Sequence, residues 1–167
     1  MFGLNFFKRP QALQIYIAAY DRGLDAAGNQ KPDHWAIIIT KSLSHAGTAH
    51  HVIHGHPLFE YRPRDDVYVL KSQSLAHVLH VGKVYEKDVK KVEDIFEKVQ
   101  VNNVDKEWNC QNWVIEAIMG CIGVSGVSLE KGIKVEKLRE LVKAASDGRD
   151  ILNERSDSYV NFFNSKD

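Results

Sequence analysis

The sequence predicts an α+β fold in which helices cover one face of an antiparallel sheet. The first half of the 167-residue chain contains short β-branched and aromatic runs separated by turn residues, a pattern typical of strands. In the second half, apolar residues recur at spacings of three and four with Lys and Glu between them, as in amphipathic helices. Strands that precede helices instead of alternating with them indicate the α+β class. A length of 167 residues is typical of one domain, so we expect a single domain over residues 1–167.

The predicted strands are short and end at recognisable turns. Asp21-Arg22-Gly23 marks a turn after the first strand, and the polar residues 25–32 form a loop before the second. The second and third strands are joined by residues 41–47, so they are expected to pair as a hairpin. Residues 63–66 are expected as a loop, and segment 75–84 favours a strand but tolerates a helix. The expected strands are 12–19, 34–40, 48–54, 58–62, 67–70 and 75–84.

Three helices are expected after the strands. The first begins at Val89, and the second begins near Asn109, a residue type that commonly caps helix N-termini. An apolar stripe runs along the second helix from Cys110 to Ile122. The third helix is expected over about residues 128–145, with Val135, Leu138, Leu141 and Val142 on its apolar face. The tail from about residue 148 is mostly polar and is expected either to dock as a strand or to pack loosely.

Composition excludes several classes of protein. The chain has 22 basic and 22 acidic residues, and this neutral balance argues against general nucleic-acid binding. Two cysteines cannot build a disulfide scaffold. No apolar run approaches the roughly 18 residues of a transmembrane helix, and the start of the chain is too short and wrongly ordered for a signal peptide. We therefore expect a cytoplasmic protein without a cofactor, and its oligomeric state stays open.

The two cysteines are expected to differ. Cys110 and Cys121 are eleven positions apart, which places them about 16 Å apart on one helix, beyond the ~7 Å limit for a disulfide. Cys121 lies beside Gly120 in the apolar stripe and is expected to be a small core residue. Cys110 lies at the helix N-terminus, which stabilises an anion and so favours a nucleophilic thiolate. The alternative is that Cys110 is simply the first core residue of the stripe.

The histidines are clustered. Five of the eight, His45, His50, His51, His54 and His56, fall within twelve residues. His34 opens a predicted strand and is a candidate general base. His51 and His54 lie on its expected partner strand but face opposite sides, so only one of them can orient His34. His45, His50 and His56 are expected to be solvated.

A metal site is the competing explanation of this cluster. Closed zinc sites usually draw their ligands from two separated segments, whereas four of these imidazoles come from one short stretch. Neither Cys-x-x-Cys nor His-Glu-x-x-His occurs in the sequence. No metal is therefore expected.

Two motifs resemble a known superfamily. His34-Trp35-Ala36-Ile37, followed by Val52-Ile53-His54, resembles the histidine hairpin of lecithin:retinol acyltransferase-like and phospholipase A/acyltransferase proteins. The segment Asn109-Cys110-Gln111-Asn112-Trp113-Val114 resembles their nucleophile helix. These proteins belong to the circularly permuted NlpC/P60 branch of papain-like folds, in which the histidine precedes the cysteine. The resemblance implies a permuted papain-like core with the nucleophile at a helix N-terminus facing an antiparallel sheet.

The chain also resembles a group of small fungal proteins. They share a His-Trp-Ala opening, a Gly-Thr-x-x-His-Val strand and a Cys-Gln-x-Trp helix start, found here at residues 34–36, 47–52 and 110–113. The two resemblances disagree about the third polar residue: the acyltransferase pattern points to His54, and the fungal pattern points to His51. The chain also lacks the long apolar anchor of some acyltransferase relatives.

Position and resemblance together predict a cysteine-dependent hydrolase or acyl/aminoacyl transferase. Cys110 would be the nucleophile, His34 the general base, and His51 or else His54 the group that orients His34. The backbone N–H of Cys110, with the side chain of Gln111 or Asn109, would hold the oxyanion. The expected substrate is a small-molecule, lipid or peptide acyl compound. Trp35, Trp113, Trp108 and Tyr61 are candidates for lining a cleft, with a place in the core as the alternative.

Three other functions stay open at this stage. The first is a non-catalytic binding module on the same scaffold, with Cys110 as a buried structural thiol. The second is an aminoacyl-tRNA-dependent cyclic dipeptide synthase, and the third is a histidine-rich metal-binding protein.

Overall fold

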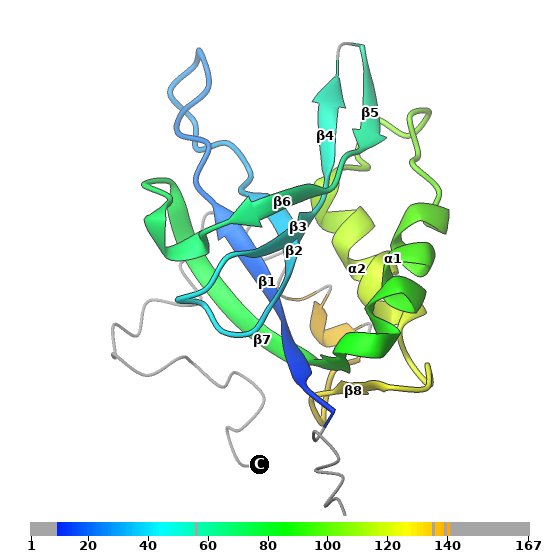
Figure 1. Ribbon diagram of the computed structural model, residues 1–167. Helices are drawn as coiled ribbons and strands as arrows, with labels where there is room; N and C mark the ends of the chain where they lie inside the picture. Colours follow the sequence, from blue (N-terminus) through cyan, green and yellow to red (C-terminus); the bar gives the residue numbers. More distant parts are fainter. Residues whose placement is uncertain (1–9, 56, 135, 139, 141–167) are drawn as a thin grey trace, which may run out of the picture.

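The computed structural model describes residues 10–55, 57–134, 136–138 and 140. An antiparallel six-stranded sheet has the strand order β6-β3-β2-β1-β7-β8, and β4 and β5 form a separate two-stranded sheet. Helices α1 and α2 lie side by side against one face of the large sheet (Figure 1). The strands are β1 (Ala12–Tyr20), β2 (His34–Thr40), β3 (Gly47–His50), β4 (Val52–Gly55), β5 (Leu58–Tyr61), β6 (Arg64–Val67), β7 (Leu75–Tyr85) and β8 (Val127–Leu129). The helices are α1 (Val89–Lys98) and α2 (Cys110–Gly120), with 3₁₀ turns η1 (Val69–Lys71) and η2 (Glu86–Asp88).

The α+β class and the antiparallel sheet are confirmed. The central hairpin pairs β1 with β2, with Ile17 opposite Ile37 and Tyr20 opposite His34. β7 runs antiparallel along the other side of β1, so segment 75–84 is a strand and not a helix. The register places His34 at the end of the sheet where the chain enters β2.

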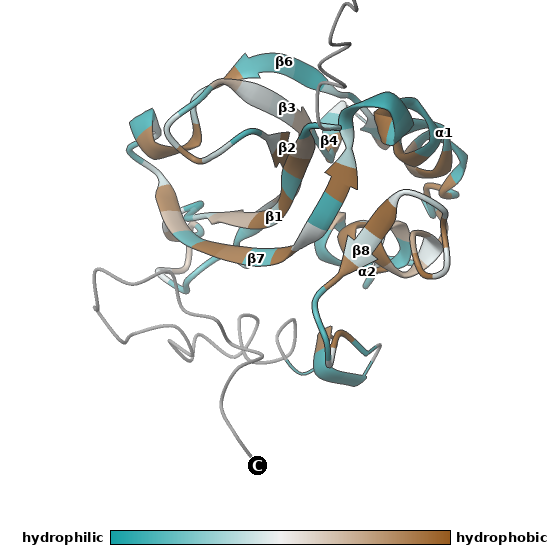
Figure 2. Ribbon diagram, turned by 60° about the horizontal axis from the view of Figure 1, so that its bottom comes forward, coloured by the Kyte–Doolittle hydropathy of each residue, from teal (hydrophilic) through white to brown (hydrophobic). Residues whose placement is uncertain are grey.

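Both faces of β2 are buried, which explains its three consecutive isoleucines. Ile37 and Ile39 face a core shared with the helices, and Ile38 faces a second core on the opposite side. The second core is built around small residues, among them Ala18 and Ala36. Figure 2 shows the strands from β6 to β7 curling, and small side chains let the backbone bend closely around this second core. A strand buried on both faces carries apolar residues at consecutive positions, as β2 does.

Helix α2 begins where the sequence predicts. Asn109 is its N-cap, and its side-chain oxygen accepts a hydrogen bond of 2.8 Å from the backbone N–H of Gln111. The side-chain oxygen of Asn112 in turn accepts a hydrogen bond of 3.0 Å from the backbone N–H of Asn109, which completes a capping box. The apolar stripe of α2 packs into the main core, with Trp113 and Ile118 fully buried. The cap therefore fixes Cys110 as the first residue of the helix.

The expected strand 48–54 is wrong as a single element. It is two strands, because the chain breaks at His51: β3 pairs with β2 in the large sheet, and β4 pairs with β5 in the small one. The apolar residues of this segment are Ala49, Val52 and Ile53, and so few positions show neither the break nor the change of sheet. Figure 1 shows β4 and β5 rising away from the large sheet.

The expected strand 67–70 and the loop before it are also displaced. Residues 64–67 form β6, and 69–71 form the 3₁₀ turn η1. Asp66 has a φ of 56°, a left-handed conformation that aspartate tolerates better than most residues. This conformation lies at an irregularity in the β3–β6 pairing, where the register shifts between Gly47 and Ala49. Turn-forming residues such as Pro63 and Asp65 predict a loop here, but in the structure this segment includes a bulged edge strand.

The third helix does not begin at residue 128. Residues 127–129 form β8, which pairs with β7 with Leu129 opposite Gly82. A side chain at Gly82 would meet the backbone of Ser128, so its lack of a Cβ permits the close approach of β8. Helical structure appears later, at 136–138 and 140, where Leu138 is fully buried. Val135, Leu141, Val142 and the tail from 148 lie outside the described residues.

None of the helices in the described part of the chain is long and apolar enough to cross a membrane.

Candidate active site

Two histidines meet at the end of the large sheet. His34 is the first residue of β2, and His51 is the residue at which β3 gives way to β4. Nε2 of His34 lies 2.8 Å from Nδ1 of His51, and the two rings meet edge to face with centroids 5.0 Å apart. The break in the strand therefore places the His51 ring next to His34.

Both imidazoles are neutral at physiological pH. Burial, aided by the charges of His51 and Arg22, lowers the pKa of His34 to about 4. Burial, aided by the charge of Arg64, also lowers the pKa of His51, although a hydrogen bond to the backbone of Arg62 opposes this shift. One ring must then donate to the other across the 2.8 Å contact.

The Arg62 bond favours one tautomer of the pair. A backbone group that stabilises the protonated form of His51 must be an acceptor, which is the Arg62 carbonyl. With Nδ1 of His51 facing His34, the nitrogen left to donate to that carbonyl is Nε2. In this tautomer Nδ1 of His51 accepts from Nε2–H of His34. This arrangement leaves a free lone pair on Nδ1 of His34, as a general base requires.

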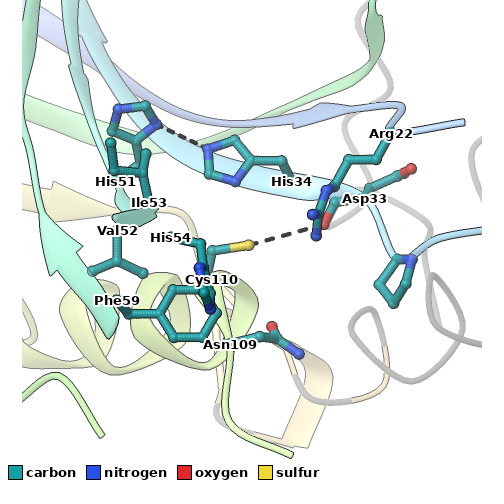
Figure 3. A pocket seen from close by; sticks show the side chains of 11 residues that line it. Arg22, Asp33, His34, His51, Val52, Ile53, His54, Phe59, Asn109 and Cys110 are labelled. Carbon is teal, nitrogen blue, oxygen red and sulfur yellow. Dashed lines mark hydrogen bonds between the residues drawn. The ribbon is translucent and has the colours of Figure 1, made fainter. Parts of the chain in front are cut away.

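Cys110 opens helix α2 on the wall of the same cavity. Its side chain is 4% exposed, and its sulfur lies 4.0 Å from the backbone oxygen of Asp33, the residue before His34. A cavity of about 390 Å³ is lined by Cys110, His34 and His51 (Figure 3). Three segments far apart in sequence thus bring a thiol and an imidazole pair together.

The pKa of the Cys110 thiol is raised, contrary to the sequence expectation. Burial is the largest cause and raises it. The backbone N–H groups of Trp35, Cys110 and Gln111, together with the positive charge of Arg22, act in the opposite direction. The helix N-terminus therefore does favour the thiolate, but desolvation outweighs it. In the protein without substrate the thiol is protonated at neutral pH.

The oxyanion candidates have different environments. Gln111 is fully buried, its Nε2 donates to the Asp33 carbonyl at 3.0 Å, and its Oε1 has no partner. It ties the start of α2 to the residue before His34 and does not line the cavity. Asn109 does line the cavity, and because its side-chain oxygen is held by the cap, its amide NH₂ is the group available there.

His54 shares the cavity but not the histidine pair. It lies on β4 and is exposed, and its ring packs edge to face on Phe59, with centroids 5.0 Å apart. Of the two candidates for orienting His34, the one hydrogen-bonded to it is His51. His54 and Phe59 instead form part of the cavity wall (Figure 3).

The tryptophans proposed for substrate binding lie in the core. Trp35, Trp113 and Trp108 are buried, and none of them lines the cavity. Tyr61 stacks on Trp113, with centroids 5.3 Å apart, and lies outside the cavity as well. The aromatic ring of the cavity wall is Phe59, which sequence reasoning missed. The sequence offers one signal for it: Phe59 lies in the expected strand 58–62, two positions before Tyr61, which the sequence also makes a candidate for lining a cleft.

The remaining histidines lie in different places. His50 was expected to be solvated, but it is 1% exposed and its Nδ1 lies 2.9 Å from the Tyr61 hydroxyl. It faces inward because it precedes the break and alternates with Ala49 on β3. His45 is exposed as expected, and His56 lies outside the described residues. Among the residues that the structure describes, no group of three His, Cys, Asp or Glu is arranged to hold a metal ion.

Sequence reasoning also missed Arg22. It belongs to the turn after β1, is exposed, and lines the cavity with Cys110 and His34. In the sequence it is one residue of a turn signal, and nothing local distinguishes it from the chain's other cations.

The chain matches no curated protein and no solved structure. A family model described as a family of unknown function, DUF6540, matches residues 15–122. That range begins within β1, extends past the end of α2, and holds His34, His51 and Cys110. The chain therefore belongs to the DUF6540 family.

Proposed function

We propose that this protein is a cysteine-dependent hydrolase or acyl/aminoacyl transferase built on a permuted papain-like core. Cys110 is the nucleophile, His34 the general base and then the general acid, and His51 orients His34. The observation that carries the proposal is the 2.8 Å bond between His34 and His51 beside the cavity that Cys110 lines. The third group on a base fixes its tautomer, and here an imidazole supplies it.

The pKa directions define how the proposed attack begins. The pKa of Cys110 is raised and that of His34 is lowered to about 4, so the resting pair is neutral thiol and neutral imidazole. The Sγ proton therefore passes to Nδ1 of His34 as the S–C bond forms, with no preformed ion pair. The carbonyl electron pair moves to oxygen, and on collapse the leaving group departs with the proton from His34.

The second half of the reaction decides between hydrolysis and transfer. The acyl group is now a thioester on Cys110, and His34 takes a proton from the incoming water or amine as it attacks. Collapse returns the thiol and releases an acid or an amide. An aminoacyl group transferred to an amine, ending in a cyclic dipeptide, is one variant of the same chemistry.

The proposed oxyanion site lies at the start of α2. The backbone N–H of Cys110 is in the first turn, where no intrahelical carbonyl can accept from it. The amide NH₂ of Asn109 lines the same cavity and supplies a second donor. Gln111 serves this site indirectly, because its bond to the Asp33 carbonyl holds α2 against the start of β2.

A panel of acyl electrophiles with mass mapping of the modified residue tests the proposal. We expect acylation of Cys110 and none of Cys121, the matched control on the same helix. Cys110→Ala removes the label, and Cys121→Ala keeps it. Equal labelling of both thiols, or full turnover by Cys110→Ala, would rule the mechanism out.

A non-catalytic binding module is the second candidate. The 4% exposure of Cys110 and its raised pKa favour it. Iodoacetamide labelling separates the two, because a module with a structural thiol leaves both cysteines inert in the folded protein. A single thiol that reacts quickly in the native state favours catalysis.

A further inference from the structure

Two cavities meet at the histidine pair. The first is the Cys110 cavity described above. The second, of about 580 Å³, is lined by residues of β2, β3, β6 and the segment between β6 and β7. Arg22, His34 and His51 line both cavities. A molecule bound at Cys110 can therefore extend past His34 toward the second cavity.

Positive side chains outnumber negative ones around the second cavity. Arg22, Arg64 and Lys71 line it, against Asp21 and Asp66. The Asp21 carboxylate is engaged in its own turn, where it accepts from the Gly23 N–H at 2.7 Å and from the Gln30 amide at 2.8 Å. These bonds hold the carboxylate within its turn and lower its pKa, so it stays ionised, and the three cations exceed the two carboxylates of the lining by one charge.

Arg22 lies where the two cavities join. Figure 3 shows its guanidinium directed into the Cys110 cavity, while the carboxylate of Asp33 points away from the sulfur. The charge of Arg22 acts on both reacting groups. It opposes the rise in the pKa of Cys110 and contributes to the fall in the pKa of His34. An anion bound to Arg22 would therefore lie close to the atom that attacks.

We propose that the substrate of Cys110 carries a carboxylate or phosphate group near its reacting carbonyl, and that Arg22 binds this anion at the junction of the two cavities. Arg64 and Lys71 extend the positive surface along the second cavity, so a longer anionic substituent lies there. Guanidinium is well suited to the role, since its fork binds carboxylate and phosphate oxygens in pairs. This inference rests on the proposed function of Cys110.

Iodoacetate and iodoacetamide test it, because both alkylate a thiolate with loss of iodide and differ in one negative charge. The ratio of their rate constants at Cys110 cancels the fraction of thiolate, which Arg22 also affects. We expect this ratio to exceed that of a small-molecule thiol and to fall about fivefold in Arg22→Gln, the size of one partly exposed charge pair. Lys31→Gln, a cation of the same loop that lines neither cavity, keeps the wild-type ratio. An unchanged ratio in Arg22→Gln, with Cys110 still reactive, overturns the inference and leaves the proposed function standing.

A second measurement does not depend on the thiol. In Cys110→Ala, inorganic phosphate and succinate are titrated while the ring resonances of His34 are followed by NMR. Saturable shifts that vanish in Cys110→Ala/Arg22→Gln support the anion site, and the tighter of the two probes tells phosphate from carboxylate. If intact Cys110 proves inert but these shifts appear, the anion site stands and the proposed chemistry falls. If neither anion shifts His34, the anion site is wrong.

Discussion

The two cysteines occupy opposite ends of helix α2, and both are buried, with exposed fractions of 4% for Cys110 and 1% for Cys121. Burial raises the pKa of Cys121 to about 12. At Cys110 burial also raises the pKa, but three backbone N–H groups and Arg22 act against it. One helix thus carries two thiols with similar exposure and different surroundings. Their difference lies in the polar groups gathered at the N-terminal end. Two of the predictions below remove a group near that end, and the third gives the pH range in which the two thiols can be compared.

The largest effect is expected from removing the base. In His34→Ala the Cys110 proton has no acceptor on Nδ1, so acylation of Cys110 should slow by about 10²–10⁴-fold. The measurement is the rate of acyl transfer to Cys110, with the extent at Cys121 recorded in the same sample. His45→Ala is the control, because His45 is exposed and lies outside the Cys110 cavity. Equal rates in wild type and His34→Ala would remove the base from the mechanism.

Some residues of this site can be predicted from the local sequence, and others depend on the tertiary structure. Cys110 and its cap are local features, because an Asn before an apolar helical stripe predicts a helix start. The partner of His34 is not local: His51 and His54 are both plausible in one strand, and only the break at His51 and the change of sheet separate them. Arg22 is contributed by a turn, whose position over the cavity depends on tertiary structure.

The fold shows the same division. The hairpin of β1 and β2 follows from strong β-branched runs, and α1 and α2 follow from helical spacing. Three residues are too few to show a period, so the sequence predicts the start of a helix where β8 pairs with β7 opposite Gly82. The helix N-terminus predicts a lowered pKa for Cys110, but the pKa is raised. The sequence shows the helix start and does not show the desolvation that outweighs it.

An intermediate effect is expected on folding stability in acid. The two thiols can be compared only at pH values where the protein stays folded. His50 is buried with its ring against Tyr61 and Phe96. Burial lowers its pKa to about 4, whereas in the unfolded chain it titrates near 6.5. Between these values the unfolded chain binds the extra proton. The contribution of His50 to stability is therefore complete above about pH 6.5 and is lost as pH falls toward 4, by roughly 3 kcal/mol.

Urea unfolding at several pH values measures this loss. Wild type should lose stability steadily from pH 6.5 to 4, and His50→Gln should be less stable at neutral pH but show a shallower pH slope. His45→Gln, an exposed histidine, should keep the wild-type slope. If His50→Gln has the same slope as wild type, another group causes the acid sensitivity.

The smallest effect separates the structural role of the helix start from its chemical role. Asn109 and Asn112 are the two halves of one capping box, so Asn109→Ala and Asn112→Ala should each cost about 1 kcal/mol in stability. Asn109 alone of the two lines the Cys110 cavity. Acyl transfer should therefore fall further in Asn109→Ala than in Asn112→Ala at matched stability, with the additional loss in kcat because an oxyanion donor acts in the transition state. If the two variants lose the same activity, Asn109 acts only as a cap, and the backbone N–H of Cys110 remains as the proposed oxyanion donor.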